Sequence, residues 1–233
     1  MKKSKTCLIL IFILFVSSLN IVGCNNERSL NSMNTSSHTI TDMAGREVTV
    51  PQNIKKVFCV SPVGTIFIYT LNPDLLVGWN YELRPSEKEY ILPEYHDLPN
   101  LGGWYAKATC NIEELLKINP DVILSVGYLD VEETNKIQQQ TGLPVIMIEV
   151  DDLLKLDEAY EFAGKLLNLE EKADELGTYC RKTAEEIIAK TALIAEEDKI
   201  NVYYAEGASG LETDPKGSSH TETLRIVGGN NVA

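Results

Sequence analysis

The sequence predicts an α/β fold in which a parallel sheet is covered by helices on both faces, with a long helix and the start of a second α/β unit after it. Three observations support this prediction. Short apolar runs alternate with helical segments over the first two thirds of the chain, a long helical stretch follows, and strand and helix then resume. Strand–helix–strand repetition implies right-handed crossovers and hence a parallel sheet.

The composition of the chain restricts its possible fold classes, partners and metal sites. The 233 residues suffice for one large domain or two small ones, and the apolar and charged fractions of 44% and 24% exclude general disorder and fibrous folds. The net charge of −13 disfavours a nucleic-acid partner. Five cysteines without C-x-x-C spacing argue against a disulfide framework, and three scattered histidines exclude a local histidine-pair metal motif.

The amino terminus is typical of a secretory signal. A lysine-rich start precedes the apolar run CLILIFILFV, which is too short to span a membrane. The segment Ile21-Val22-Gly23-Cys24 then resembles the lipobox of bacterial lipoproteins, so we expect residues 1–23 to be a signal peptide and Cys24 to carry lipid. Residues 24–38 are rich in Ser and Asn and are expected to form a flexible tether. The alternative is an uncleaved signal anchor.

The first elements of the body follow from local patterns. Residues 39–50 predict a β-hairpin around Met43-Ala44-Gly45, residues 56–60 (KVFCV) a buried strand, and residues 63–71 a helix after a Ser-Pro start signal. Residues 75–79 are expected to be the next strand. Residues 80–110 form a long irregular stretch, and a loop of that length is usually functional.

The pattern then becomes regular. Asn111 is expected to cap a helix that ends at Ile118, because Asn119-Pro120 stops it. Residues 121–125 and 145–149 predict strands, and residues 131–141 predict the helix that connects them.

A long helical stretch comes next. Residues 156–167 form one predicted segment and residues 170–195 a second, which is long enough to brace two lobes, although a long surface helix on one domain is an equal alternative. Residues 200–205 are then expected to be a strand, and residues 220–227 a helix ended by Gly228-Gly229.

The last strand and helix cannot bury a core by themselves. Either they pack on the first lobe, or most of a second lobe is missing, and we favour the second interpretation. The expected organisation is an amino-terminal binding lobe at 39–155, an interlobe helical segment at 156–197 and the incomplete start of a carboxy-terminal lobe at 198–233.

Several segments in order resemble a known family: KVFCVSPVGTIFIYTL, LLVGWN, LPNLGGW, NIEELLKINPDVIL and GSSHTETLRIVGGNNVA. Together they are similar to the iron-complex and vitamin B12 type of substrate-binding protein of ABC importers, over Thr39 to Ala233. The resemblance implies a class III substrate-binding protein with two Rossmann-like lobes joined by one rigid helix. The GGNNVA block lies early in the second lobe of such proteins, so the chain is expected to be truncated. It also departs from the family, because Ile66 follows Thr65 where relatives often have Glu.

The resemblance implies a function. The chain would be a lipid-anchored, extracytoplasmic receptor that captures an iron–siderophore, haem or corrinoid complex and delivers it, as a monomer, to an ABC permease and its ATPase. It would have no intrinsic cofactor and perform no catalysis. Two alternatives are a hydrolase-like α/β enzyme using Ser219 and His220, and a surface binder that sequesters metal without a transporter.

Ligands of open parallel sheets bind at the carboxyl ends of the strands, and aromatic walls suit bulky chelates. Trp79 could equally pack in the core, and a lone histidine such as His220 is more often a cap or surface residue than a metal ligand or anion contact. The ligand-binding residues expected on this basis are Trp79, Asn80, Tyr81, Trp104, Tyr105, Tyr128, Tyr204, Glu206 and His220.

In proteins of this type one acid on each lobe contacts the permease. The resemblance assigns this docking role to Glu113 and Glu222. Both residues also fit the simpler description of first-turn acids that complement a helix dipole.

Overall fold

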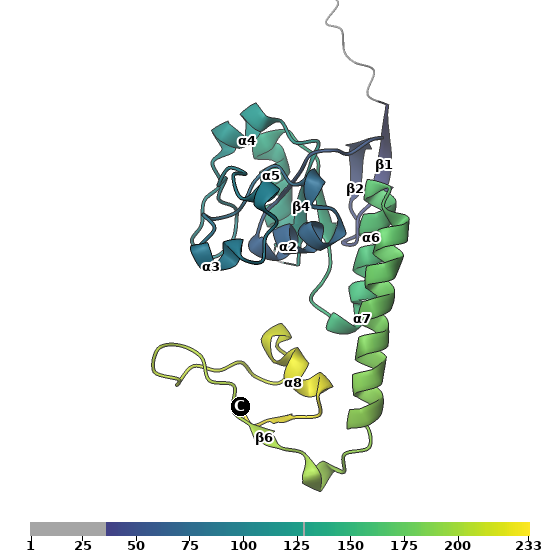
Figure 1. Cartoon of the computed structure of the whole chain (residues 1–233), viewed down its shortest axis with the longest axis vertical. Coiled ribbons are helices and arrows are strands. Elements are labelled where there is room, and N and C mark those ends of the chain that lie inside the picture. The colour runs from purple at the N-terminus through teal and green to yellow at the C-terminus, as the bar shows by residue number, and fades with distance from the viewer. Residues whose placement is uncertain (1–35, 128) are drawn as a thin grey trace, which may run out of the picture. The chain divides into compact units, whose positions relative to one another are not determined.

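The computed structural model describes residues 36–127 and 129–233 (Figure 1). The predicted signal peptide, the lipidation site Cys24, most of the tether and the predicted ligand residue Tyr128 lie outside these residues. No helix in the described ranges combines the length and the apolar character that crossing a membrane requires.

The predicted hairpin is confirmed, as strands β1 (Ser37–Thr41) and β2 (Glu47–Pro51) pair antiparallel. The hairpin starts two residues inside the predicted tether, because His38 pairs with Val50. Its turn is fixed by Asp42, whose carboxylate accepts hydrogen bonds from the backbone N–H of Arg46 at 2.8 Å and from the guanidinium of Arg46 at 3.1 Å.

The predicted parallel sheet is also confirmed. Strands β3 (Val57–Cys59), β4 (Val122–Val126) and β5 (Val145–Ile148) run parallel in the order β3-β4-β5. Every residue of the three strands is buried, which explains why their sequences are almost uninterrupted apolar runs.

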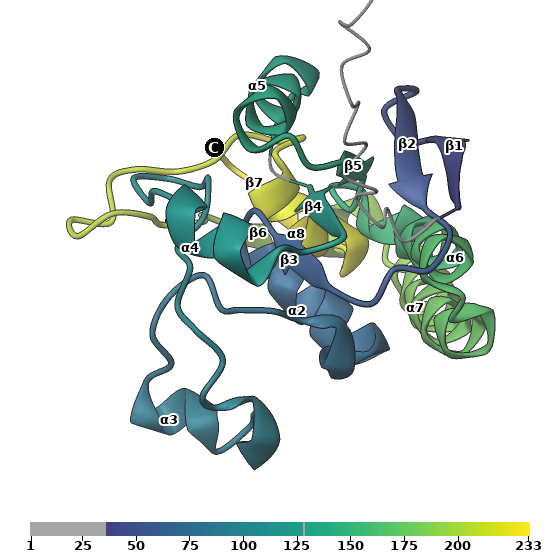
Figure 2. The same ribbon diagram turned by 90° about the horizontal axis from the view of Figure 1, so that it is seen from above.

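Helices cover both faces of this sheet (Figure 2). On one face, helices α2 (Pro62–Leu71) and α6 (Leu156–Leu167) contribute to a core with strand residues such as Leu124. On the other face, α4 (Ile112–Ile118) and α5 (Val131–Thr141) contribute to a second core around Ile123. This arrangement confirms the predicted fold class.

The strand predicted at residues 75–79 is wrong. A 3₁₀ turn, η2 (Pro73–Leu75), occupies its start, and the chain then makes only single bridges, from Leu76 to Val57 and from Trp79 to Asn100. The segment leaves the edge of β3 after one bridge and pairs with the returning loop, so no ladder forms. The long loop itself contains α3 (Pro85–Lys88) and η3 (Pro93–Tyr95).

Helix α7 (Glu170–Thr191) packs along α6, as Figure 1 shows. The contact is close, since a Cβ on Gly164 would lie 2.4 Å from the Cβ of Ala173. At about 1.5 Å per residue, α7 is about 33 Å long. It ends four residues earlier than predicted, at Thr191, and a separate 3₁₀ turn, η5 (Glu196–Asp198), follows.

The carboxy-terminal segment contains a second strand–helix–strand unit. Strands β6 (Asn201–Val202) and β7 (Asn230–Asn231) are parallel, and η6 (Ser219–Thr221) and α8 (Glu222–Ile226) lie between them in sequence. The predicted strand at 200–205 is therefore shorter, since its partner offers only two residues. The connection from β5 to α6 includes η4 (Leu153–Lys155).

Candidate functional site

A cavity of about 530 Å³ opens at the carboxyl ends of β4 and β5, the edge where ligands of parallel sheets bind. We call it the strand-end pocket. Its lining combines the last residues of both strands and the segments that follow them with Met43 of the β1–β2 turn and Glu158 of α6. The lining residues are Met43, Ser125, Gly127, Leu129, Asp130, Met147, Ile148, Glu149, Asp151, Asp152, Lys155 and Glu158.

Ser125 is the most informative residue of this pocket. It is 2% exposed, and within the described part of the chain its buried hydroxyl has no hydrogen-bond partner. An unpaired buried hydroxyl costs free energy, so its position in a pocket lining points to a partner that the chain does not supply. Gly127 follows with φ +57°, and a Cβ there would lie 2.3 Å from Val150 Cγ2, so glycine keeps this turn free of a side chain.

The charges around the pocket are mostly negative. Lys155 is the only basic residue of the lining, and it faces five carboxylates: Asp130, Glu149, Asp151, Asp152 and Glu158. Burial, and then the nearby charge of Glu222, raise the pKa of Asp151. The pocket therefore favours a cation or a polar neutral group over an anion.

Two predicted ligand residues, Trp79 and Asn80, are buried and hydrogen-bonded within the chain. Trp79 is 5% exposed, and its indole N–H donates to the carbonyl of Tyr95 at 2.8 Å, so it packs in the core. Asn80 is 4% exposed; its side-chain amide donates to the carbonyls of Cys59 at 2.8 Å and Gly102 at 2.9 Å, and its oxygen accepts from Thr65 Oγ1. Asn80 therefore connects the loop to the end of β3, and both of its side-chain N–H donors are used within the chain.

The aromatic residues of the loop lie at the surface beside these anchors. Tyr81 is 38% exposed, and its hydroxyl lies 3.4 Å from Glu87 Oε1. The hydroxyl of Tyr105 donates to the carbonyl of Asn80 at 3.1 Å, and burial raises its pKa. Trp104 is half-buried, with its ring edge-on to Phe58 at a centroid distance of 6.3 Å.

Trp104 and Tyr105 line a cavity of about 590 Å³ against α5, which we call the α5 pocket. Leu129 lines both this cavity and the strand-end pocket. The two predicted aromatic walls therefore line the α5 pocket, and neither is among the residues that line the strand-end pocket.

The predicted residues of the carboxy-terminal segment form a separate group. Tyr204 is 38% exposed, and the side chains of Glu206 and His220 converge. Asp214 joins them: its Oδ2 lies 2.5 Å from His220 Nδ1, and Glu206 Oε1 lies 3.7 Å from the same nitrogen. Asp214 is not among the ligand residues that the sequence predicts, because a loop acid six residues before a histidine has no recognisable periodicity.

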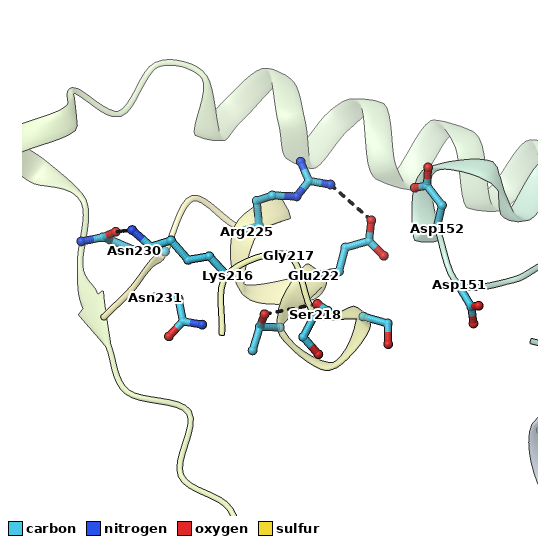
Figure 3. A pocket seen from close by; sticks show the side chains of 12 residues that line it. Asp151, Asp152, Lys216, Gly217, Ser218, Glu222, Arg225, Asn230 and Asn231 are labelled. Carbon is cyan, nitrogen blue, oxygen red and sulfur yellow. Dashed lines mark hydrogen bonds and ion pairs between the residues drawn. The ribbon is translucent and has the colours of Figure 1, made fainter. Parts of the chain in front are cut away.

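A third cavity, of about 410 Å³, lies between α8 and residues Asp151 and Asp152 (Figure 3). We call it the α8 pocket, and it includes Glu222. One carboxylate oxygen of Glu222 accepts from the backbone N–H of Leu153 at 3.0 Å and the other from Arg225 at 3.2 Å, and its side chain is 12% exposed. Both oxygens of Glu222 are therefore engaged within the chain, and its docking role stays a prediction.

Glu113, the other predicted docking acid, is free to reach a partner. Its side chain is 83% exposed in the first turn of α4, and its one ion pair in the described part of the chain is to Lys117, at 3.0 Å. Asn111 caps this helix as predicted, with its side-chain oxygen accepting from the backbone N–H of Glu114 at 3.2 Å.

With the fold and its pockets established, the chain can be compared with known proteins. A family model described as periplasmic binding protein matches residues 85–233. The chain belongs to the periplasmic binding protein family. This confirms the resemblance found in the sequence, and a family of binding proteins agrees with the expectation that the chain is not an enzyme.

Three solved structures show how far the similarity extends. An ABC transporter solute binding protein from Sulfurospirillum deleyianum has a TM-score of 0.75 at 28% identity, over 83% of this chain and 62% of that one. The molybdate periplasmic binding protein MolA of Haemophilus influenzae has a TM-score of 0.69 at 20% identity, over 84% and 66%. The siderophore binding protein BauB, bound to acinetobactin and ferric iron, has a TM-score of 0.65 at 14% identity, over 85% and 68%.

The similarities to MolA and to BauB concern the fold alone. The chain spans about three fifths to two thirds of the length of these periplasmic binding proteins. No match was found among curated proteins.

Proposed function

We propose that this periplasmic binding protein is the substrate-binding component of an ABC importer, and that it captures a metal complex of the iron–siderophore, haem or corrinoid type and delivers it to the permease. The family membership and the 28% identity to an ABC transporter solute binding protein support the transport role. The observation that carries the binding role is Ser125, a buried hydroxyl without a partner in the strand-end pocket.

The charge of the pocket supports a complex over a free oxyanion. Five carboxylates against Lys155 repel an anion such as molybdate, the ligand of MolA, at close range. Neutral or cationic chelates with hydroxyl or amine groups can instead donate hydrogen bonds to the carboxylates of the strand-end pocket. The α5 pocket adds Trp104 and Tyr105 as flat apolar surfaces for a bulky ligand.

The remaining parts of the proposal concern the membrane and the partner. Lipid on Cys24 would hold the protein at the extracytoplasmic face of the cell membrane, and Glu113 would contact the permease. For the anchor, Cys24→Ala should release the protein or leave the precursor uncut. Palmitate labelling and normal membrane retention of that variant would contradict it.

Native mass spectrometry and metal analysis of the purified full chain test the binding role. The chain should retain a metal complex at one per molecule, or bind one of three probes in titrations: a ferric hydroxamate siderophore, haemin or cobalamin. Molybdate serves as the anionic comparison. Binding of molybdate in preference to all three complexes would contradict the proposal.

A further inference from the structure

We infer that Glu206, Asp214 and His220 bind a divalent transition-metal ion directly, without any chelator. This inference goes beyond the proposed capture of a metal complex and does not depend on it. One ligand atom from each residue, namely the two carboxylate oxygens and the histidine nitrogen, lies within 4.8 Å of the other two. We call these residues the carboxylate–histidine cluster.

The distances suit a metal centre after small rotations of the side chains. Ligand atoms about 2.0–2.2 Å from a zinc ion lie roughly 3–3.5 Å from one another. The nitrogen His220 Nδ1 lies 2.5 Å from Asp214 Oδ2 and 3.7 Å from Glu206 Oε1, on either side of that range. The His220 side chain is 65% exposed and can adjust without disturbing a core. An ion bound at His220 Nδ1 would take the place of the hydrogen between this nitrogen and Asp214 Oδ2, and the neutral imidazole would carry its one proton on Nε2.

The cluster carries uncompensated negative charge. Among the residues that the structure describes, neither Glu206 nor Asp214 forms an ion pair with Lys or Arg. The nearest basic residue in sequence, Lys216, instead donates to Asn230 Oδ1 at 3.0 Å. Two carboxylates held together without a cation repel one another, and a divalent ion would relieve that repulsion.

Backbone contacts hold the three residues on separate supports. Glu206 exchanges backbone hydrogen bonds with Glu212, which closes a short loop. The carbonyl of Asp214 accepts from the side-chain amide of Asn231 at 3.0 Å, which fixes it beside β7. The backbone N–H of His220 donates to Ser218 Oγ at 3.3 Å, at the start of η6. The cluster is thus positioned before an ion arrives.

The donor set selects the class of ion. One imidazole and two carboxylates suit Zn²⁺, Co²⁺, Mn²⁺ or Fe²⁺, whereas Ca²⁺ and Mg²⁺ prefer oxygen ligands alone. Three protein ligands leave at least one position for water or for a donor atom of another molecule.

Titration of the purified full chain with Co²⁺ tests the inference, because the visible spectrum of Co²⁺ reports its ligands. We expect one bound ion per chain, displaced by Zn²⁺ but not by equal concentrations of Ca²⁺. His220→Ala and Asp214→Asn should each weaken binding at least tenfold and change the spectrum. The matched controls His38→Ala, in the exposed part of β1, and Glu132→Gln, on α5, should bind as the parent does.

Circular dichroism of each variant confirms that the fold is retained, which the exposure of His220 leads us to expect. Co²⁺ binding of equal affinity in the parent and in both cluster variants would overturn the inference, as would parent binding that Ca²⁺ displaces as readily as Zn²⁺. Neither result bears on the capture of a metal complex, which is measured with the chelates themselves.

Discussion

The carboxylate of Glu222 accepts a hydrogen bond from the backbone N–H of Leu153 over 3.0 Å. This bond connects the first turn of α8 to the segment that leaves β5, although the two residues are 69 positions apart in the chain. Asp151 and Asp152, just before Leu153, line both the α8 pocket and the strand-end pocket. The bond therefore fixes the segment that the two pockets share.

This arrangement predicts the behaviour of Asp151, whose pKa is raised by burial and then by the charge of Glu222. Glu222→Gln removes that charge but keeps the shape, so the pKa of Asp151 should fall toward its ordinary value without reaching it, because burial remains. Carbon-13 NMR of the Asp151 carboxyl group measures this. An unchanged pKa would mean that Glu222 does not act on Asp151.

The raised pKa of Asp151 also makes the stability of the fold depend on pH. A carboxyl group with a raised folded-state pKa binds its proton more tightly in the folded chain, so its ionised form opposes folding. Asp151→Asn should therefore raise the free energy of unfolding at pH 7. The difference should shrink as the pH falls through the folded pKa toward the ordinary value of 3.8. Urea denaturation across this range would contradict the account if the gain grew with acid.

Asn80 is predicted to stabilise the fold rather than to bind ligand. Asn80→Ala leaves the buried carbonyls of Cys59 and Gly102 without their donor, which should lower the free energy of unfolding by about 2–3 kcal/mol. Asn135→Ala, at an exposed position on α5, is the control and should cost well under 1 kcal/mol. Chemical denaturation measures the free energy of unfolding of both variants. Similar small losses in the two would show that the buried amide of Asn80 is dispensable for stability.

Trp104 is predicted to form a wall for the ligand. Removing the ring should weaken a bulky chelate by roughly 1–3 kcal/mol. Fluorescence titration of Trp104→Ala with the co-purified complex tests this, with Tyr90→Ala, 83% exposed in the loop, as the control. Unchanged affinity in a folded Trp104→Ala variant would assign the ring to packing against Phe58 alone.

Glu113 is predicted to matter for transport and not for ligand affinity. Glu113→Ala should lower uptake or transporter ATPase stimulation, and Glu113→Lys should lower it further through repulsion. Glu132 provides the matched control: it is 78% exposed in the first turn of α5 and pairs with Lys136, much as Glu113 pairs with Lys117. Parent transport rates for both Glu113 variants at low salt would leave Glu113 as a helix-dipole acid only.

Local signals predicted much of this fold. Helix α5 has the bounds that the sequence predicts, and in the structure Asp130 caps its start and Gly142, at φ +69°, ends it. Burial of Trp79 and Asn80 could not be read from their positions after an apolar run, because it depends on contacts with the distant loop residues Tyr95 and Gly102.

The candidate sites were harder to predict for the same reason. Ser125 lies at a strand end where the sequence predicts that a ligand binds, but its missing hydrogen-bond partner is apparent only in three dimensions. Asp214 approaches His220 through a loop without periodicity, whereas Glu206 and His220 were found because they follow a strand and begin a helix.

The central claim is that the strand-end pocket holds the ligand, and Ser125→Ala tests it most directly. Thr134→Val is the matched control, because the Thr134 hydroxyl is also buried and unpaired in the described chain but does not line this pocket. In titrations with the co-purified metal complex, Ser125→Ala should bind about fivefold more weakly, the loss of one hydrogen bond of about 1 kcal/mol, and Thr134→Val should bind as the parent does. Parent affinity in Ser125→Ala, or an equal loss in both variants, would contradict the account.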